Sequence, residues 1–209
     1  ISARQMKVLP GAGINLDEYP YVPMQDDGVC SFLFVGRIMK EKGVDEFFSA
    51  AKTIKAEFGE KVAFDVVGFY EDAYKETVDH LVADRVINFH GFQTDVHPFY
   101  EAADCVVLPS YHEGMSNVLL EGAAMGRALI TSDISGCREA VEDGVSGYLC
   151  PAQDAEALTN FFREFAGKTH IEQEQMGRCG RALIEQKFDK HIVVAQTIDG
   201  LILPMTARN

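Results

Sequence analysis

Short apolar segments alternate with segments of helical periodicity from residue 30 to residue 166. The apolar segments are 31–35, 62–67, 86–89, 105–108, 128–131 and 147–150. The segments with helical spacing are 44–58, 72–83, 94–102, 118–125 and 137–142. Strands that are apolar on both faces and are separated by helices are typical of a parallel sheet covered on both sides. The pattern therefore predicts a doubly wound, Rossmann-like α/β fold with about six strands.

Two further segments flank this alternating core. Residues 1–28 are rich in proline and glycine and predict an extended lead-in. Residues 154–200 predict two or three additional helices. Because the chain starts with Ile1, we interpret the lead-in as a cut through a longer protein. We divide the chain into an interdomain lead-in (1–28), a ligand-binding domain (29–188) and a C-terminal helix and tail (189–209).

Charge and cysteine content exclude several classes of protein. The chain has 19 Lys and Arg against 32 Asp and Glu, a net charge of −13, which argues against nucleic-acid binding. It has no apolar run long enough to predict a transmembrane helix. Its five cysteines show neither C-x-x-C nor zinc spacing, and the histidines show no metal-ligand spacing. We expect buried reduced thiols and no metal.

The loop after the first predicted strand, residues 36–43, carries two cations behind a glycine. It matches neither the dinucleotide fingerprint nor the P-loop pattern. Gly36 lets a ligand approach the backbone closely. Arg37 can make a bidentate contact to phosphate oxygens, and Lys42 can act as a point charge. On spacing alone, a solvated charged loop explains these residues equally well.

The loop after the fourth predicted strand leads into a helix, and the start of this helix is the second candidate binding feature. Ser116 or Asn117 is a good N-cap, so the N–H groups of Asn117 and Val118 form an anion site. Glu113 precedes this helix start and Glu121 follows it, in the second helical turn. Carboxylates accept hydrogen bonds from sugar hydroxyls, although Glu121 also fits a role in complementing the helix dipole. Together the two loops predict a site for a diphosphate flanked by two sugar-like groups.

Three segments carry a family resemblance: GRIMKEKG (36–43), EGMSNVLLE (113–121) and SGCREAVEDGVSGYL (135–149). They resemble the C-terminal, donor-binding half of retaining GT-B glycosyltransferases of family GT4, the glycosyl transferases group 1. The resemblance covers residues 6–200. Its specificity comes from the E-x7-E spacing of Glu113 and Glu121 together with the G-R-x4-K-G loop upstream, since each motif alone is weak. It implies that the N-terminal acceptor domain is missing from this chain. Met115 and Ser116 stand where the family often has an aromatic residue and glycine.

The resemblance also implies a role for each matching residue. Arg37 and Lys42 hold the donor diphosphate and stabilise it as it leaves, and Glu113 contacts the donor sugar near its reacting face. Glu121 binds the ribose hydroxyls. The remaining contacts to the substrate are Gly36 in the first loop, Gly114, Met115 and Ser116 around the sugar, Asn117 and Val118 on the phosphate, and Phe92 and Gln93 along the base.

The resulting expectation is a glycosyltransferase whose isolated fragment is inactive. The donor is a nucleotide sugar, with UDP preferred over GDP, and no cofactor or metal is expected. The acceptor is a glycan or lipid-linked sugar, bound through the missing domain, in surface polysaccharide or glycoconjugate synthesis. We expect a cytoplasmic location or one at the inner face of the membrane, with peripheral membrane contact through the missing domain. The alternatives are a non-catalytic nucleotide-sugar binding module and another GT-B enzyme, such as a sugar-nucleotide epimerase.

The final helical stretch, about 189–202, resembles the family segment that crosses back to the N-terminal domain, so we expect its apolar residues to be exposed in this chain. The apolar residues concerned are Ile192, Val193, Ile198, Leu201 and Ile202. Their exposure predicts self-association of the isolated chain.

Overall fold

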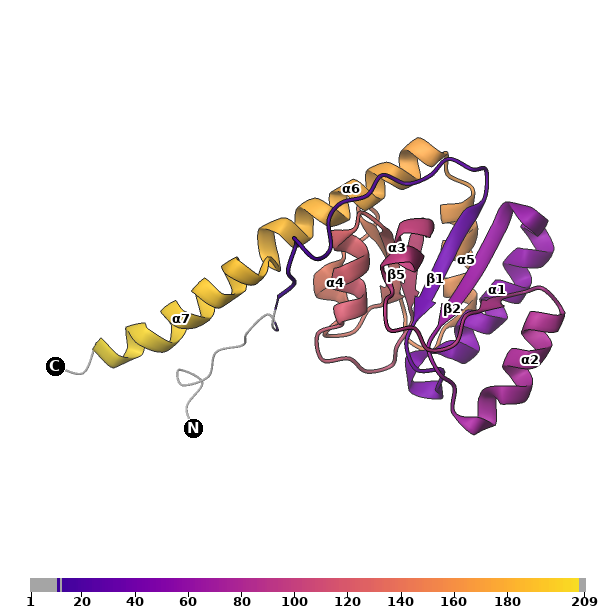
Figure 1. The fold of residues 1–209 in the computed structure, drawn as a ribbon, viewed down its shortest axis with the longest axis horizontal. Coiled ribbons are helices and arrows are strands. Elements are labelled where there is room, and N and C mark those ends of the chain that lie inside the picture. Colours follow the sequence, from indigo (N-terminus) through magenta and orange to yellow (C-terminus); the bar gives the residue numbers. More distant parts are fainter. Residues whose placement is uncertain (1–10, 12, 207–209) are drawn as a thin grey trace.

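The computed structural model describes residue 11 and residues 13–206 as a parallel sheet with helices on both faces (Figure 1). The strands are β1 (Cys30–Val35), β2 (Val62–Val67), β3 (Asn88–Phe89), β4 (Cys105–Leu108), β5 (Ala128–Ser132) and β6 (Gly147–Cys150). All pairings are parallel, and the strand order is β3-β2-β1-β4-β5-β6. The predicted doubly wound fold is confirmed.

The helices follow the predicted order. They are α1 (Val44–Phe58), α2 (Lys75–Ala83), α3 (His97–Ala102), α4 (Asn117–Ala124), α5 (Ala155–Ala166), α6 (His170–Lys187) and α7 (Lys190–Thr206). Helices α1 and α5 pack together on one face of the sheet, and α4 and α6 pack together on the other (Figure 1). No described helix is both long and apolar enough to cross a membrane.

Three predicted elements are shorter than expected. The strand predicted over 86–89 begins at Asn88, because Arg85 has a positive φ of 57° and the Val86 N–H bonds to the Leu81 carbonyl. The helix predicted over 94–102 begins at His97, where the Asp95 carboxylate accepts the His97 N–H. The helix predicted over 137–142 is a single 3-10 turn, Arg138–Ala140. In the first two cases a local backbone or side-chain hydrogen bond competes with the regular element.

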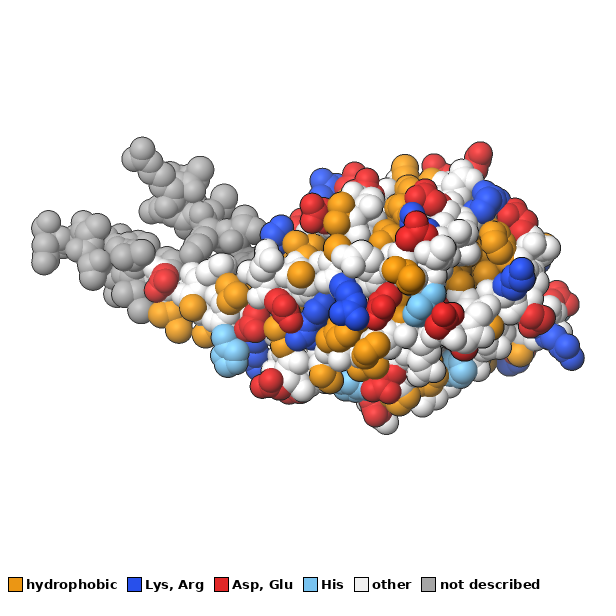
Figure 2. All heavy atoms as spheres, turned by 90° about the horizontal axis from the view of Figure 1, so that it is seen from above, with side chains coloured by type: hydrophobic (Ala, Val, Ile, Leu, Met, Phe, Trp, Pro, Cys, Tyr) orange, Lys and Arg blue, Asp and Glu red, His pale blue; other side chains and the backbone are white. Residues whose placement is uncertain are grey.

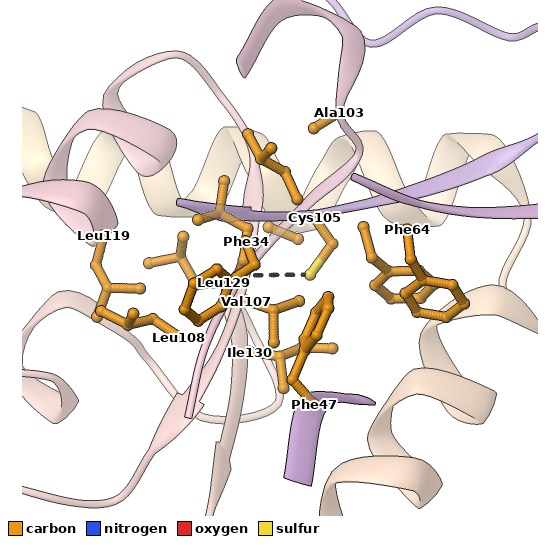
Figure 3. Packing of buried hydrophobic residues seen from close by; sticks show 14 of the residues in the cluster. Phe34, Phe47, Phe64, Ala103, Cys105, Val107, Leu108, Leu119, Leu129 and Ile130 are labelled. Atoms are coloured by element: carbon orange, nitrogen blue, oxygen red, sulfur yellow. Dashed lines mark hydrogen bonds between the residues drawn. The ribbon is translucent and has the colours of Figure 1, made fainter. Parts of the chain in front are cut away.

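The core on the α1 and α5 face is built from phenylalanines. Phe32 on β1 stacks on Phe64 of β2 with ring centroids 5.1 Å apart, and Phe162 of α5 lies 4.7 Å from Phe32. Phe47 of α1 meets the edges of Phe64 and Phe162. All four rings are buried, and Figure 3 shows part of this packing. Aromatic pairs in these geometries stabilise a core beyond their buried area, so they fix α1 and α5 against the two strands.

The strand order places a topological switch between β1 and β4. The chain leaves β1 toward β2 and β3, and it leaves β4 toward β5 and β6, so the two loops at the carboxyl ends of β1 and β4 diverge. Ligands of open α/β sheets bind in the crevice between such loops. The two loops singled out in the sequence, 36–43 and 109–116, are these two loops.

The described part of the lead-in packs on the domain. The Ile14 N–H donates to the Phe188 carbonyl at 2.8 Å, and Arg181 on α6 donates to the Tyr19 carbonyl at 2.8 Å. The fully buried guanidinium of Arg127 bonds to the carbonyls of Ala103, Met125 and Val22. This buried cation therefore joins the lead-in to the segments that run into β4 and β5. The rest of the lead-in, residues 1–10 and residue 12, lies outside the described residues.

Helix α7 continues beyond the sheet in line with α6 (Figure 1). The prediction that Val193 is exposed is wrong: only 2% of it is exposed, because it packs beside Gly13 at the lead-in. Ile198 is exposed as predicted, together with Val194. The side chains of Leu201 and Ile202 lie outside the described residues. Acidic and basic side chains are interspersed over the face seen in Figure 2.

Candidate functional site

A cleft of about 470 Å³ lies at the carboxyl ends of β1 and β4, at the topological switch. It is lined by Val35, Gly36, Arg37, Met39, Lys42, Phe69, Leu108, Glu113, Met115, Ser116, Asn117 and Val118. Most of the site residues predicted from the sequence therefore converge here, from loops more than 70 residues apart. Phe92, Gln93, Gly114 and Glu121 do not line this cleft.

The two predicted cations, Arg37 and Lys42, line the same cleft but differ in exposure and in their partners. The Arg37 guanidinium is exposed and lies over the ring of Phe69, 5.5 Å from its centroid. Among the residues that the structure describes, no carboxylate pairs with Arg37. Lys42 is half-buried, and its Nζ lies 2.5 Å from Oε1 of Glu113. Arg37 is thus free to take an incoming anion, whereas Lys42 already holds one carboxylate.

The Glu113 carboxylate has two donors on one oxygen. The Ser110 hydroxyl donates to Oε1 at 2.7 Å, and the Lys42 ammonium donates to the same atom. The Glu113 side chain is only 13% exposed, so both contacts offset the cost of desolvating its charge.

Helix α4 begins at the cleft with Ser116 as its N-cap. The Ser116 Oγ accepts the Leu119 N–H at 3.4 Å, and the Ser116 carbonyl accepts the Leu120 N–H at 3.2 Å. The first two amides of the helix, those of Asn117 and Val118, have no acceptor among the described residues. Unpaired amides at a helix N-terminus favour an anion, so the predicted anion-binding helix start is present next to both cations.

Two glycines bring these loops together. Gly43, at the start of α1, has a φ of +68°, and a Cβ there would lie 2.0 Å from the Pro109 carbonyl oxygen. Gly136 has a φ of +89°, and a Cβ there would lie 1.6 Å from the Gly114 carbonyl oxygen. Gly136 also accepts the Ser116 N–H at 3.1 Å. Only glycine combines this backbone conformation with so close an approach.

Glu121 lies in a neighbouring cavity of about 270 Å³ that shares Asn117 with the cleft. The Tyr100 hydroxyl donates to Oε2 of Glu121 at 2.8 Å. The Tyr19 phenol is a second neighbour of this carboxylate, and burial together with Glu121 raises the pKa of Tyr19 to about 12. Burial raises the pKa of Glu121 itself, against the lowering effect of the two phenols. Glu121 is thus a partly buried carboxylate with partners of its own.

The loop after β3 holds the residues predicted to line a base. Phe92 is 67% exposed, and the Gln93 amide donates to the His90 carbonyl at 2.7 Å. The loop is tied to the residue that follows β2 through the Gly68 N–H, which donates to the Gly91 carbonyl at 2.8 Å. Phe92 and Gln93 do not line the cleft, and their role stays a prediction.

Sequence reasoning missed several residues of the site. Ser110 and Tyr100 contact the two carboxylates, Tyr19 faces Glu121, and Phe69 lies under Arg37. Ser110 carries a signal in its position two residues after the end of β4, in the loop singled out from the sequence. The other three come from different elements, and only the tertiary structure brings them to the site.

The strand order and the cleft at its switch define this chain as a Rossmann-like α/β domain of the GT-B type. The chain belongs to the glycosyl transferases group 1 family, whose model matches residues 30–166.

Relatives of the chain are glycosyltransferases by name, and one is named for capsular polysaccharide biosynthesis. The chain is 28% identical over 155 residues to the N,N'-diacetylbacillosaminyl-diphospho-undecaprenol alpha-1,3-N-acetylgalactosaminyltransferase of Campylobacter jejuni, covering 74% of this chain and 38% of that protein. It is 28% identical to the capsular polysaccharide biosynthesis glycosyltransferase CapM of Staphylococcus aureus, covering 86% of this chain and 47% of that protein. The chain thus spans less than half the length of both relatives.

Solved structures share the fold. HepE of Anabaena, solved in complex with UDP, superposes with a TM-score of 0.79 at 20% identity over 96% of this chain and 58% of that one. The sucrose-phosphate synthase of Thermosynechococcus elongatus superposes with a TM-score of 0.77 at 25% identity, over 95% of this chain and 52% of that one.

Proposed function

We propose that this chain is the donor-binding half of a retaining glycosyltransferase that uses a nucleoside diphosphate sugar, with UDP as the nucleotide. One observation carries the proposal. Arg37, Lys42 and the two unpaired amides of α4 converge on one cleft at the topological switch. The overall charge of −13 does not oppose anion binding there, because charges beyond about 8 Å are largely screened at physiological salt.

The chemistry of sugar transfer explains this set of groups. Breaking the bond between a sugar and a diphosphate places negative charge on the leaving group. Fixed cations and a helix N-terminus stabilise such charge without reorganisation. The proposal therefore gives Arg37 and Lys42 the role of stabilising the leaving diphosphate, without a metal or other cofactor.

The two carboxylates take the sugar groups of the donor. Glu113, at the cleft, contacts the transferred sugar, with Gly114, Met115 and Ser116 around it. Glu121, in the neighbouring cavity, accepts the ribose hydroxyls in place of one of its present donors, Tyr100 or Tyr19. Phe92 and Gln93 flank the base.

The acceptor is a glycan or lipid-linked sugar, and it binds through a domain outside this chain. The support is the length of the relatives and their names, which include capsular polysaccharide and colanic acid biosynthesis. We place the protein in the cytoplasm or at the inner face of the membrane, and its five free cysteines fit a reducing compartment.

The test is calorimetric titration of this chain with UDP, GDP and ADP, beside an Arg37→Ala/Lys42→Ala variant. We expect saturable binding of UDP that the double variant loses. Lys75→Ala is the control, because Lys75 is an exposed lysine that pairs with Asp79 away from the cleft. Binding of UDP that survives in the double variant would contradict the proposed diphosphate site. Preference for GDP or ADP would keep the site and correct the nucleotide.

A further inference from the structure

We propose that Ser110 is a positioning residue that fixes the carboxylate of Glu113 for contact with the donor sugar. The inference rests on the proposed function, in which Glu113 faces that sugar. Ser110 itself is fully buried and reaches the donor only through Glu113.

The hydrogen bonds at Glu113 are asymmetric. Ser110 Oγ lies 2.7 Å from Oε1, and Lys42 Nζ lies 2.5 Å from the same oxygen. Within the described part of the chain, Oε2 has no donor. One oxygen is therefore held by the protein, and the other is the atom left to accept a hydroxyl of the ligand.

The two donors restrain the carboxylate in different ways. The ammonium of Lys42 is a point charge on a flexible stem, so it attracts the carboxylate without defining its rotation. The Ser110 side chain has one heavy-atom torsion and a single O–H donor, and a hydrogen bond from that O–H has a preferred direction. When a diphosphate competes for Lys42, the Ser110 hydroxyl is the donor that stays on Oε1.

The backbone around Ser110 is fixed independently of Glu113. The next residue, Tyr111, donates its N–H to the Glu41 carbonyl at 2.8 Å, and its hydroxyl lies 2.9 Å and 3.0 Å from the two carboxylate oxygens of Glu46 on α1. These contacts anchor the loop after β4 to the start of α1, the element that Lys42 precedes. Ser110 is thus presented from a rigid loop, as a positioning residue requires.

The experiment compares binding of UDP with binding of UDP-glucose, UDP-galactose and UDP-N-acetylglucosamine, by calorimetry on this chain. For the wild type we expect one sugar conjugate to bind more tightly than UDP. Ser110→Ala should weaken that conjugate about tenfold and change UDP affinity less than twofold. Ser110→Thr, which keeps the hydroxyl, should restore most of the difference.

Thr131→Val is the matched control. Thr131 is also fully buried, and its hydroxyl donates to the Leu108 carbonyl at 2.6 Å and not to Glu113. It should lower the melting temperature as Ser110→Ala does, yet leave the preference for the sugar conjugate unchanged. A loss of preference in Thr131→Val would mean that Ser110 acts through stability alone.

The outcomes separate the inference from the proposed function. A wild type that binds no nucleotide overturns both. Two results would overturn the inference and leave the nucleotide site standing. In the first, the wild type binds UDP but binds none of the three UDP-sugars more tightly. In the second, Ser110→Ala keeps the wild-type preference for a UDP-sugar over UDP.

Discussion

The ammonium of Lys42 and the carboxylate of Glu113, 71 residues apart in the sequence, form an ion pair across the cleft. Each is a candidate for a different part of the donor, the diphosphate and the sugar. A diphosphate that enters the cleft therefore competes with Glu113 for Lys42. The two residues should have opposite effects on the binding of a nucleotide that lacks a sugar.

Neutralising the two partners of this pair is the first prediction. Glu113→Gln should strengthen UDP binding about threefold, because it frees Lys42 and removes a negative charge near the diphosphate. Lys42→Met should weaken UDP binding roughly tenfold or more, the cost of a charge-assisted hydrogen bond. Calorimetric titration measures both. Equal weakening by the two substitutions would show that the pair acts as a unit and that Lys42 is not shared.

Gly136 gives a prediction about how the cleft is built. Alanine at this position combines a positive φ with a Cβ that meets the Gly114 carbonyl oxygen. Gly144→Ala is the matched control, because Gly144 has a φ of +73° and open space around it. Gly144→Ala should cost about 1–2 kcal/mol of unfolding free energy, from the backbone alone. Gly136→Ala should cost more and should also weaken UDP binding; denaturant unfolding that finds equal costs would contradict the close approach.

Asp104 predicts a pH dependence of stability. Burial raises its pKa to about 6, although the Ser31 N–H and Arg127 both oppose the rise. A raised folded-state pKa means that the native state binds the proton more tightly, so this group's contribution is full below about pH 4 and is lost as pH rises through 6. The stability of Asp104→Asn relative to wild type should therefore rise by about 2 kcal/mol from pH 4 to pH 7. Urea unfolding at several pH values measures this difference, and a constant difference would refute the raised pKa.

Arg127 predicts a large loss of stability on removal of one buried cation. Arg127→Met keeps much of the volume but leaves the carbonyls of Ala103 and Val22 without their donor and Asp104 without a nearby positive charge. The expected loss is about 3 kcal/mol or more. Arg138→Met is the control, since Arg138 is half-exposed and pairs with exposed Asp133, and it should change stability by about 1 kcal/mol or less. Similar losses of unfolding free energy in the two variants would mean that burial of Arg127 adds nothing to its contribution to stability.

Some local elements depended on contacts that the sequence pattern does not display. The apolar pair Val86 and Ile87 has the composition of a strand, yet the turn at Arg85 makes Val86 cap the end of α2. Val193 lies in an apolar helix that suggested exposure, and its burial comes from the lead-in, about 180 positions earlier in the chain. Periodicity reports which face of a segment is apolar, and it does not report what covers that face.

The sequence by itself determined the succession of strands and helices along the chain, the parallel sheet and the two loops of the cleft. These follow from local hydrophobic periodicity and from the rule that ligands bind where the strand order switches. Only the tertiary structure decided that Lys42 pairs with Glu113, that Ser110 shares its oxygen, and that Tyr100 contacts Glu121. The physical reason is that hydrogen bonds and ion pairs act over a few ångströms, and those distances are set by packing between segments far apart in the chain.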